Sequence, residues 1–227
     1  MGGVGQVMGS VAFDVSHLLA GGLVLTSFMM IYQDRLHALI NVFAFQAVVL
    51  AAAVAWQALV QDAHHLYVTA AIALVFKAIL VPWALHAIVQ RLGVHREVET
   101  AVSVVPTMLA GIGLVALAIM LMLQLTAGED PLAQEDLAFA LAVVLLGLLM
   151  MVTRRNAVSQ VIGFMSLENG LMLAATGAKG MPFVVEISVA FSVLIAMIVV
   201  GVFLFRIRER FDTVDVGALD EFRGERE

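Results

Sequence analysis

The sequence contains no cysteine, few charged residues and few interruptions in its hydrophobic runs. The absence of cysteine among 227 residues excludes disulfides, iron–sulfur clusters and thiolate metal sites from this chain. Charged residues make up 13% of the chain, against about a quarter in an ordinary soluble domain. Hydrophobic residues make up 62%, and the mean hydropathy is +1.02. We therefore expect an integral membrane protein.

Motifs of nucleotide binding and hydrolysis are absent as well. The chain has no G-x-x-x-x-G-K-[ST] phosphate loop, no G-x-G-x-x-G after a strand and no H-E-x-x-H zinc motif. The 13 methionines are scattered as packing residues rather than paired as metal ligands. His64 and His65 are adjacent but lack further metal-ligand spacing. We expect no catalytic centre, no metal site and no cofactor in this chain.

Long apolar runs separated by short polar loops dominate the chain. A membrane-spanning helix needs about 20 predominantly apolar residues. Seven runs approach or exceed this length, at 12–32, 38–60, 66–90, 102–125, 136–153, 157–176 and 183–206. None has the alternating pattern of a β-barrel strand, and the first lacks the basic flank and cleavage site of a signal peptide. The predicted fold is an all-α membrane bundle of about seven transmembrane helices.

The basic residues fall almost entirely on one side of these spans. If the C-terminus is cytoplasmic, one lysine remains outside, Lys179, and ten arginines lie inside: Arg35, Arg91, Arg96, Arg154, Arg155, Arg206, Arg208, Arg210, Arg223 and Arg226. Cytoplasmic loops of membrane proteins carry such an excess of Lys and Arg. The pattern predicts an N-terminus outside, a C-terminus in the cytoplasm and an odd number of spans.

Two ionisable residues, Lys77 and Glu168, lie deep within predicted spans. Each is about 11 residues from one end of its span, which at 1.5 Å per residue places both roughly 16 Å deep, near the membrane centre. A charge there costs on the order of 2.5–3.5 kcal/mol on insertion scales, so each must find protein, water or a partner. The pair is either a structural lock or part of an ion relay. We predict that both line one hydrated polar axis parallel to the membrane.

Small residues form a stripe on the span that carries Glu168. Ser159, Gly163, Ser166 and Gly170 fall within about 60° on a helical wheel, which favours close approach of another helix. Glu168 projects almost opposite this stripe. A carboxylate facing lipid would be stranded, so we expect a second protein surface to cover it. Either the rest of the bundle or another subunit provides this surface, and we favour a partner subunit.

Three further residues have both structural and functional interpretations. Pro82 removes a backbone donor and predicts a kink or loosened turn, which packing alone explains equally well. His86, near the inner interface, is either a hydrated interfacial residue or a proton-entry group. Glu186 follows Pro182 in the first turn of the last span, where helix capping explains it about as well as ion transport.

Several short motifs between Thr153 and Gly224 carry a family resemblance: "RRN", "IGFMSLENG", "MPFVVE" and "DEFRG". The chain resembles the hydrogenase-4 component E family, small membrane subunits of group 4 nickel–iron hydrogenases and related complexes, over nearly its whole length. The C-terminal region is also similar to the K subunit of bacterial complex I and to the C subunit of multisubunit sodium/proton antiporters. These three-helix relatives carry a membrane glutamate that matches Glu168.

The resemblance implies a non-catalytic subunit of an ion-translocating oxidoreductase complex in a bacterial or archaeal cytoplasmic membrane. Implied partners are large antiporter-like membrane subunits, a cytoplasmic hydrogenase-like or iron–sulfur arm and membrane lipid, with no nucleic acid. It also implies a division into a four-helix segment (1–130), a three-helix segment (131–210) and a cytoplasmic acidic tail (211–227). A multisubunit antiporter subunit and a passive scaffold remain alternatives.

One position departs from the complex I relative. That relative has a second glutamate near the middle of its last helix, and an ungapped match of the "DEFRG" ends places Leu194 there. Glu186 lies two turns nearer the outer surface. Either the ion path runs through Glu186, or this subunit conducts protons less completely.

Overall fold

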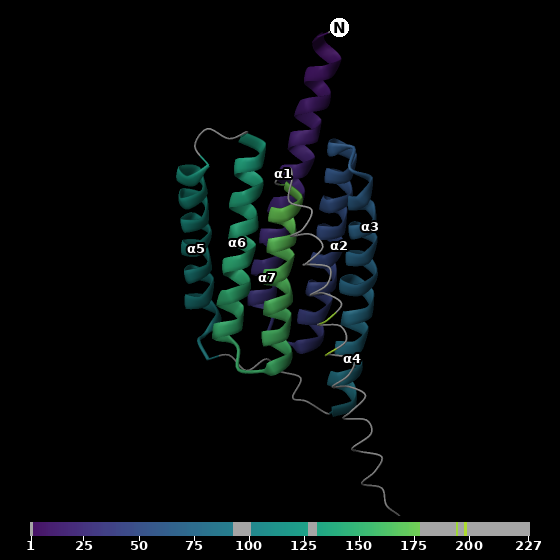
Figure 1. The fold of residues 1–227 in the computed structure, drawn as a ribbon. Coiled ribbons are helices and arrows are strands. Elements are labelled where there is room, and N and C mark those ends of the chain that lie inside the picture. Colours follow the sequence, from purple (N-terminus) through teal and green to yellow (C-terminus); the bar gives the residue numbers. More distant parts are fainter. Residues whose placement is uncertain (1, 93–100, 127–130, 178–193, 195–197, 199–227) are drawn as a thin grey trace, which may run out of the picture.

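The computed structural model of this chain describes residues 2–92, 101–126 and 131–177, with the isolated positions 194 and 198. All regular elements in this part are helices, and they run side by side along one direction (Figure 1). Six candidate membrane spans are long and apolar enough to cross a bilayer: Val11–Tyr32, Leu36–Gln61, His64–Gln90, Val104–Leu125, Gln134–Thr153 and Ala157–Thr176.

These helices confirm six of the seven predicted spans. The seventh, 183–206, lies outside the described residues apart from Leu194 and Ile198, and so do Glu186 and the tail 211–227. The division of the chain at residue 130 stays a prediction, as does the orientation of the bundle in a membrane.

The elements follow one another with short connections. In chain order they are α1 (Gly2–Tyr32), α2 (Leu36–Gln61), α3 (His64–Ile72), η1 (Ala73–Leu80), α4 (Val81–Leu92), α5 (Val104–Leu125), α6 (Pro131–Thr153) and α7 (Ala157–Gly177). The turn after α2 shows how the chain reverses so tightly. Asp62 adopts a left-handed conformation with φ 53° and donates its N–H to Ala58 O. Asp tolerates the left-handed region better than most residues. The chain can therefore reverse at Asp62, and α3 starts two residues later.

The third span is not a uniform α-helix. Between α3 and α4 the chain widens into the π-helix η1, in which the Val81 N–H bonds to Phe76 O five residues earlier. Pro82 follows directly. Its ring would clash with the carbonyl four residues before it in an α-helix, and the wider turn relieves this crowding. The loosened turn next to Pro82 therefore includes Lys77, and π-helical turns frequently occur at functional sites.

Helices α6 and α7 are packed backbone against backbone. A Cβ atom on Gly147 would lie 2.7 Å from Leu167 N, and one on Gly170 would lie 2.8 Å from Ala140 O. A Cβ on Gly163 would lie 3.2 Å from Gly147 O. Because no larger side chain fits without a shift, these glycines set the distance between the two helices.

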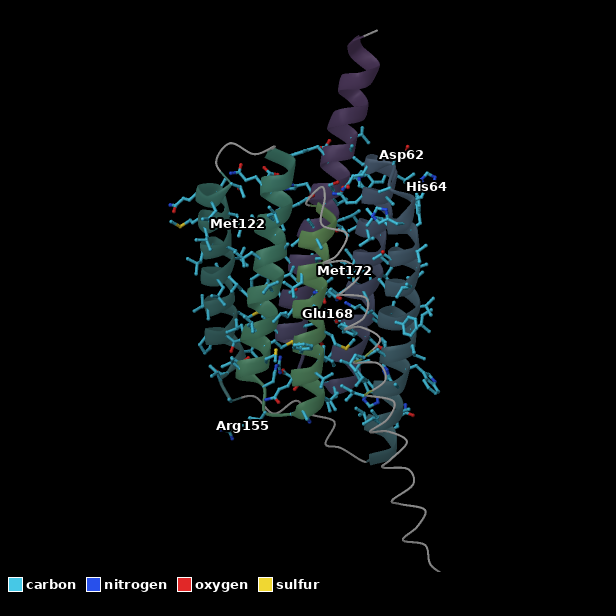
Figure 2. All side chains as sticks on the ribbon, viewed as in Figure 1. Asp62, His64, Met122, Arg155, Glu168 and Met172 are labelled. Carbon is cyan, nitrogen blue, oxygen red and sulfur yellow. The ribbon has the colours of Figure 1, made fainter. Side chains whose placement is uncertain are left out.

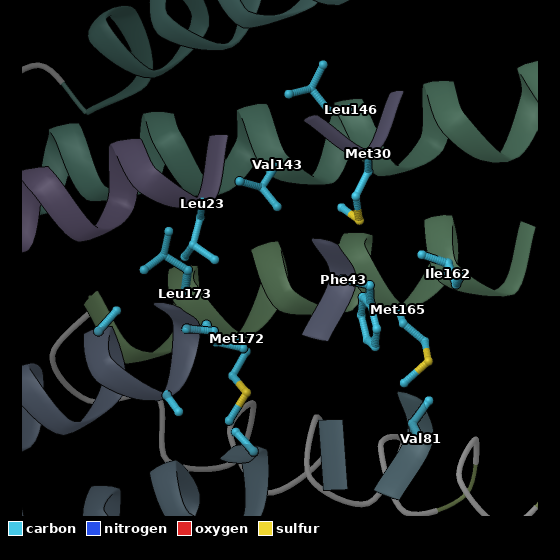
Figure 3. Packing of buried hydrophobic residues seen from close by; sticks show 14 of the residues in the cluster. Leu23, Met30, Phe43, Val81, Val143, Leu146, Ile162, Met165, Met172 and Leu173 are labelled. Carbon is cyan, nitrogen blue, oxygen red and sulfur yellow. The ribbon is translucent and has the colours of Figure 1, made fainter. Parts of the chain in front are cut away.

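The remaining interior is mostly apolar. Side chains of α1, α2, α6 and α7, among them Leu23, Phe43, Val143 and Ile162, interdigitate in one buried cluster (Figure 3). Helix α5 lies at the edge of the bundle beside α6 and buries only a few of its residues (Figure 1). The polar groups described below are therefore surrounded by an apolar matrix, in which each must find a partner.

Candidate functional site

The structure brings Lys77 and Glu168 into direct contact. Lys77 Nζ lies 3.2 Å from Glu168 Oε1. Both side chains are buried, with exposed fractions of 0% and 4%. Glu168 lies near mid-height of the bundle, between the end marked by Asp62 and the end marked by Arg155 (Figure 2). In this ion pair each charge is compensated by the other, as charges in a membrane interior require.

Of the two covers expected for Glu168, the bundle itself is the one found, and the preference for a partner subunit was wrong. Its carboxylate is covered within this chain, where it meets Lys77 of η1. A helical wheel gives directions around α7 alone and says nothing about which helix lies on each side. In the bundle α7 contacts α6 through its glycines and also packs on α2, so an internal neighbour was available for the carboxylate.

The stripe of small residues serves two neighbours rather than one. Gly163 and Gly170 pack against α6. Ser166 instead accepts a hydrogen bond from Gln46 of α2. Ser159 stays local and donates to Asn156 O at the start of α7.

A chain of hydrogen bonds leads away from the ion pair toward α2. Lys77 Nζ donates to Asn169 Oδ1 at 2.9 Å, and Asn169 Nδ2 donates to Gln46 Oε1 at 3.1 Å. Asn169 and Gln46 both have an exposed fraction of 0%. The lysine charge is therefore joined to α2 by two fully buried amides.

The chain continues from Gln46 to α1. Gln46 Nε2 donates to Ser27 Oγ at 2.8 Å and to Ser166 Oγ at 3.1 Å. The Ser27 hydroxyl in turn donates to Leu23 O at 2.9 Å. We call the following six residues the polar line: Lys77, Glu168, Asn169, Gln46, Ser166 and Ser27. It crosses the bundle from η1 through α7 and α2 to α1.

The geometry of the polar line limits its chemistry. Every donor from Lys77 to Ser27 points the same way, so the bonds polarise one another along one direction. Amide side chains do not release protons under ordinary conditions. Lys77 and Glu168 are the two ionisable members of the polar line, and the amides join them by hydrogen bonds to α2 and α1.

His86 is placed on the same span as Lys77 but apart from the polar line. Its Nδ1 lies 2.9 Å from Pro82 O, and its ring meets the ring of His37 at 5.4 Å between centroids. Lys77 precedes His86 by nine residues, roughly two and a half helical turns. No contact among the described residues joins His86 to Lys77, so its predicted role in proton entry stays a prediction.

A second buried carboxylate lies nearer the Asp62 end. Asp136 of α6 accepts a hydrogen bond of 3.1 Å from Gln57 of α2, and beside it His17 pairs with Glu135 at 2.8 Å. The described residues contain no group of three or more His, Asp or Glu side chains that could hold a metal ion.

Two functional-looking residues escaped the sequence analysis. Gln46 lies within the apolar run "VFAFQAVVL", where an isolated amide marks an internal hydrogen bond. Arg154 of the "RRN" motif was counted only for orientation, yet it is buried and donates to the carbonyls of Met30 and Ile31 at the end of α1. In both cases the signal is a polar side chain that is buried away from solvent.

The chain has relatives along nearly its whole length. It is 33% identical to an uncharacterized protein of Mycobacterium tuberculosis over 208 residues, 90% of this chain and 94% of that protein. It is 30% identical to hydrogenase-4 component E of Escherichia coli K12 over 217 residues, 91% of this chain and 96% of that protein, and equally to its counterpart in Shigella flexneri. No protein-family profile and no solved structure matches the chain. The extent and level of identity show that this protein belongs to the hydrogenase-4 component E family.

Proposed function

We propose that this chain is a non-catalytic membrane subunit of a hydrogenase-type or complex I-type assembly and takes part in proton or sodium translocation. The name of its relatives, hydrogenase-4 component E, supports the assembly. The observation that carries the ion-translocating role is the buried Lys77–Glu168 pair, joined by hydrogen bonds to helices on the other side of the bundle. Large antiporter-like membrane subunits and a cytoplasmic redox arm are the proposed partners.

The contact between Lys77 and Glu168 suggests how charge would move. A proton that arrives on Glu168 removes the negative charge that holds the lysine ammonium at 3.2 Å. The buried ammonium is then uncompensated, and its proton would pass to a water molecule or a titratable side chain of a neighbouring subunit. Loss of that charge changes the polarisation of Asn169 and Gln46, which reach toward α1. Glu168 and Lys77 would thus exchange protons in sequence while the amides report the change to neighbouring helices.

A cation/proton antiporter subunit would use the same residues without a redox partner. Neighbouring genes separate these cases, because a hydrogenase assembly brings genes for catalytic and iron–sulfur subunits. A passive scaffold is the remaining alternative, since a buried ion pair can act as a lock between helices. The scaffold requires only that the pair be stable, whereas translocation requires that it titrate.

Breaking the polar line at its centre tests the proposal without touching either charge. Gln46→Leu keeps the side-chain size but cuts Asn169 off from Ser27, at a cost of about 1–3 kcal/mol for the partners left unsatisfied. We expect the subunit to remain in its complex while proton transport per turnover falls several-fold. The measurement is quenching of a pH-sensitive dye in vesicles that contain the purified complex.

Gln57→Leu is the matched control, because Gln57 is buried on the same helix but bonds to Asp136 outside the polar line. An equal loss of transport in both variants would mean that α2 tolerates no lost amide, and the polar line would have no special role.

We also propose that the Arg155 end faces the cytoplasm, as the distribution of arginines predicts. Reporter fusions after Arg35, Arg96 and Arg155 should then read cytoplasmic, and fusions near Asp62 and Glu129 should read external. A fusion series in which Asp62 and Arg155 report the same side would contradict both the orientation and the number of spans between them.

A further inference from the structure

Arg154 carries a buried nitrogen that the described part of the chain leaves unsatisfied. This arginine follows α6 directly and has an exposed fraction of 3%. Its Nη2 donates to Met30 O and Ile31 O, which caps the end of α1. Its Nη1 is buried and has no hydrogen-bond partner among the described residues. A buried polar group without a partner is rare and needs an explanation, and an anion is one that suits a guanidinium.

The guanidinium lines a narrow crevice that also receives the start of α5. The lining residues are Ile31, Val102, Val104, Thr107, Thr153 and Arg154. Ser103, at the N-cap of α5, makes no side-chain hydrogen bond to the first turn, and Pro106 contributes no N–H. The first turn of this 22-residue helix therefore lacks its usual cap. A helix N-terminus and a buried arginine thus converge on one crevice, and both attract anions.

Among the described residues, no carboxylate lines this crevice. Burial lowers the pKa of Arg154, and the electrostatic influence of Asp34 opposes part of that shift. An arginine remains positively charged at physiological pH despite such a change. The positive charge of the site is therefore only partly balanced within the described residues.

The surface beside the crevice is apolar. Val105, Leu109 and Ile112 are 70%, 64% and 58% exposed, and their spacing puts them on one face of α5. Of the six candidate spans, α5 has the smallest buried share, 17% of its most apolar window. Acyl chains can lie along this face with a headgroup at the helix end, because the crevice lies where the spanning helices end.

We propose that this crevice binds a phosphate oxyanion, which the apolar face of α5 supplies as the headgroup of a phospholipid. Two phosphate oxygens would meet the Arg154 guanidinium and the first-turn N–H groups of α5. The crevice is too narrow to admit a water molecule as it stands. Entry of the phosphate requires the half-exposed Val102 side chain to move aside.

Ser103→Asp tests the site without removing the arginine. The new carboxylate caps α5 and occupies the place of the anion, while Arg154 still caps α1. Thermal unfolding of the purified full chain in detergent is followed with dioleoylphosphatidylglycerol, with dioleoylglycerol, which lacks phosphate, and with inorganic phosphate. We expect phosphatidylglycerol to raise the Tm of the wild-type chain by a few degrees and Ser103→Asp to weaken its binding by about tenfold or more.

Arg155→Gln is the control, because Arg155 is exposed and should bind phosphatidylglycerol as the wild type does. Stabilisation by inorganic phosphate alone supports the oxyanion site but assigns its source to free phosphate. Equal stabilisation by dioleoylglycerol, or unchanged binding by Ser103→Asp, overturns the proposal.

Discussion

In vesicles that contain the complex, the Glu168→Gln variant should move about a tenth or less of the protons that the wild type moves per turnover. Redox turnover or cation exchange itself should continue. Gln has the shape of Glu and still accepts a hydrogen bond from Lys77, so the subunit should assemble. The Gln side chain cannot take up and release a proton, so the charge beside Lys77 no longer changes during turnover. The measurement is dye quenching per turnover in vesicles with the purified complex.

A double variant separates titration from structural support. Removing one member of a buried ion pair costs about 3–5 kcal/mol, whereas replacing both by apolar residues of similar volume is often neutral. Glu168→Leu alone should therefore destabilise the subunit, and Glu168→Leu with Lys77→Met should recover most of that loss. Proton movement should stay absent in both. If the double variant recovers transport together with stability, the pair is a lock and the scaffold interpretation is correct.

The depth of these charges could be predicted from the sequence, because depth depends only on residue rise along one helix. Counting from the ends of the apolar runs placed Lys77 and Glu168 at the same level, and the structure brings them to 3.2 Å. The spans were predictable for the same reason. Apolar runs of sufficient length have to become helices in lipid, since each backbone N–H needs a partner within its own segment.

The neighbours of each helix could not be predicted in this way. Which span lies against Glu168 depends on how the helices pack around α7, and that order is decided by many small contacts. The 2.7 Å that a Cβ on Gly147 would leave to Leu167 N is one such contact. The sequence predicted the direction in which Glu168 projects from its own helix. It did not predict that the third span lies against Glu168.

Polar residues with a local explanation were also harder to interpret. Gln46 has no charge, so it carries no insertion penalty large enough to attract notice, yet it is the junction between Asn169, Ser166 and Ser27. Arg154 lies in a motif with several basic residues and was explained by orientation alone. In each case burial, rather than residue type, identifies the role, and burial requires the fold.

Lys77→Arg is expected to reduce coupled transport nearly as much as Lys77→Ala. Arginine keeps the positive charge beside Glu168 but does not release its proton at any physiological pH. A relay that needs Lys77 to titrate therefore fails, while a site that needs only fixed charge continues to work. Transport per turnover is measured across pH in vesicles, together with the amount of subunit retained in the complex.

The retained amount is what makes the comparison of Arg and Ala decisive. Lys77 is fully buried in η1, so the larger guanidinium can fail simply by not fitting. Lys77→Met is the matched variant, since it has a similar length and no charge, and with Glu168 still ionised it should lose more stability than Lys77→Arg. Poor transport by a well-assembled Lys77→Arg complex would then be due to the missing titration. Wild-type transport in that complex would reduce Lys77 to a fixed charge and leave Glu168 as the only titrating member of the polar line.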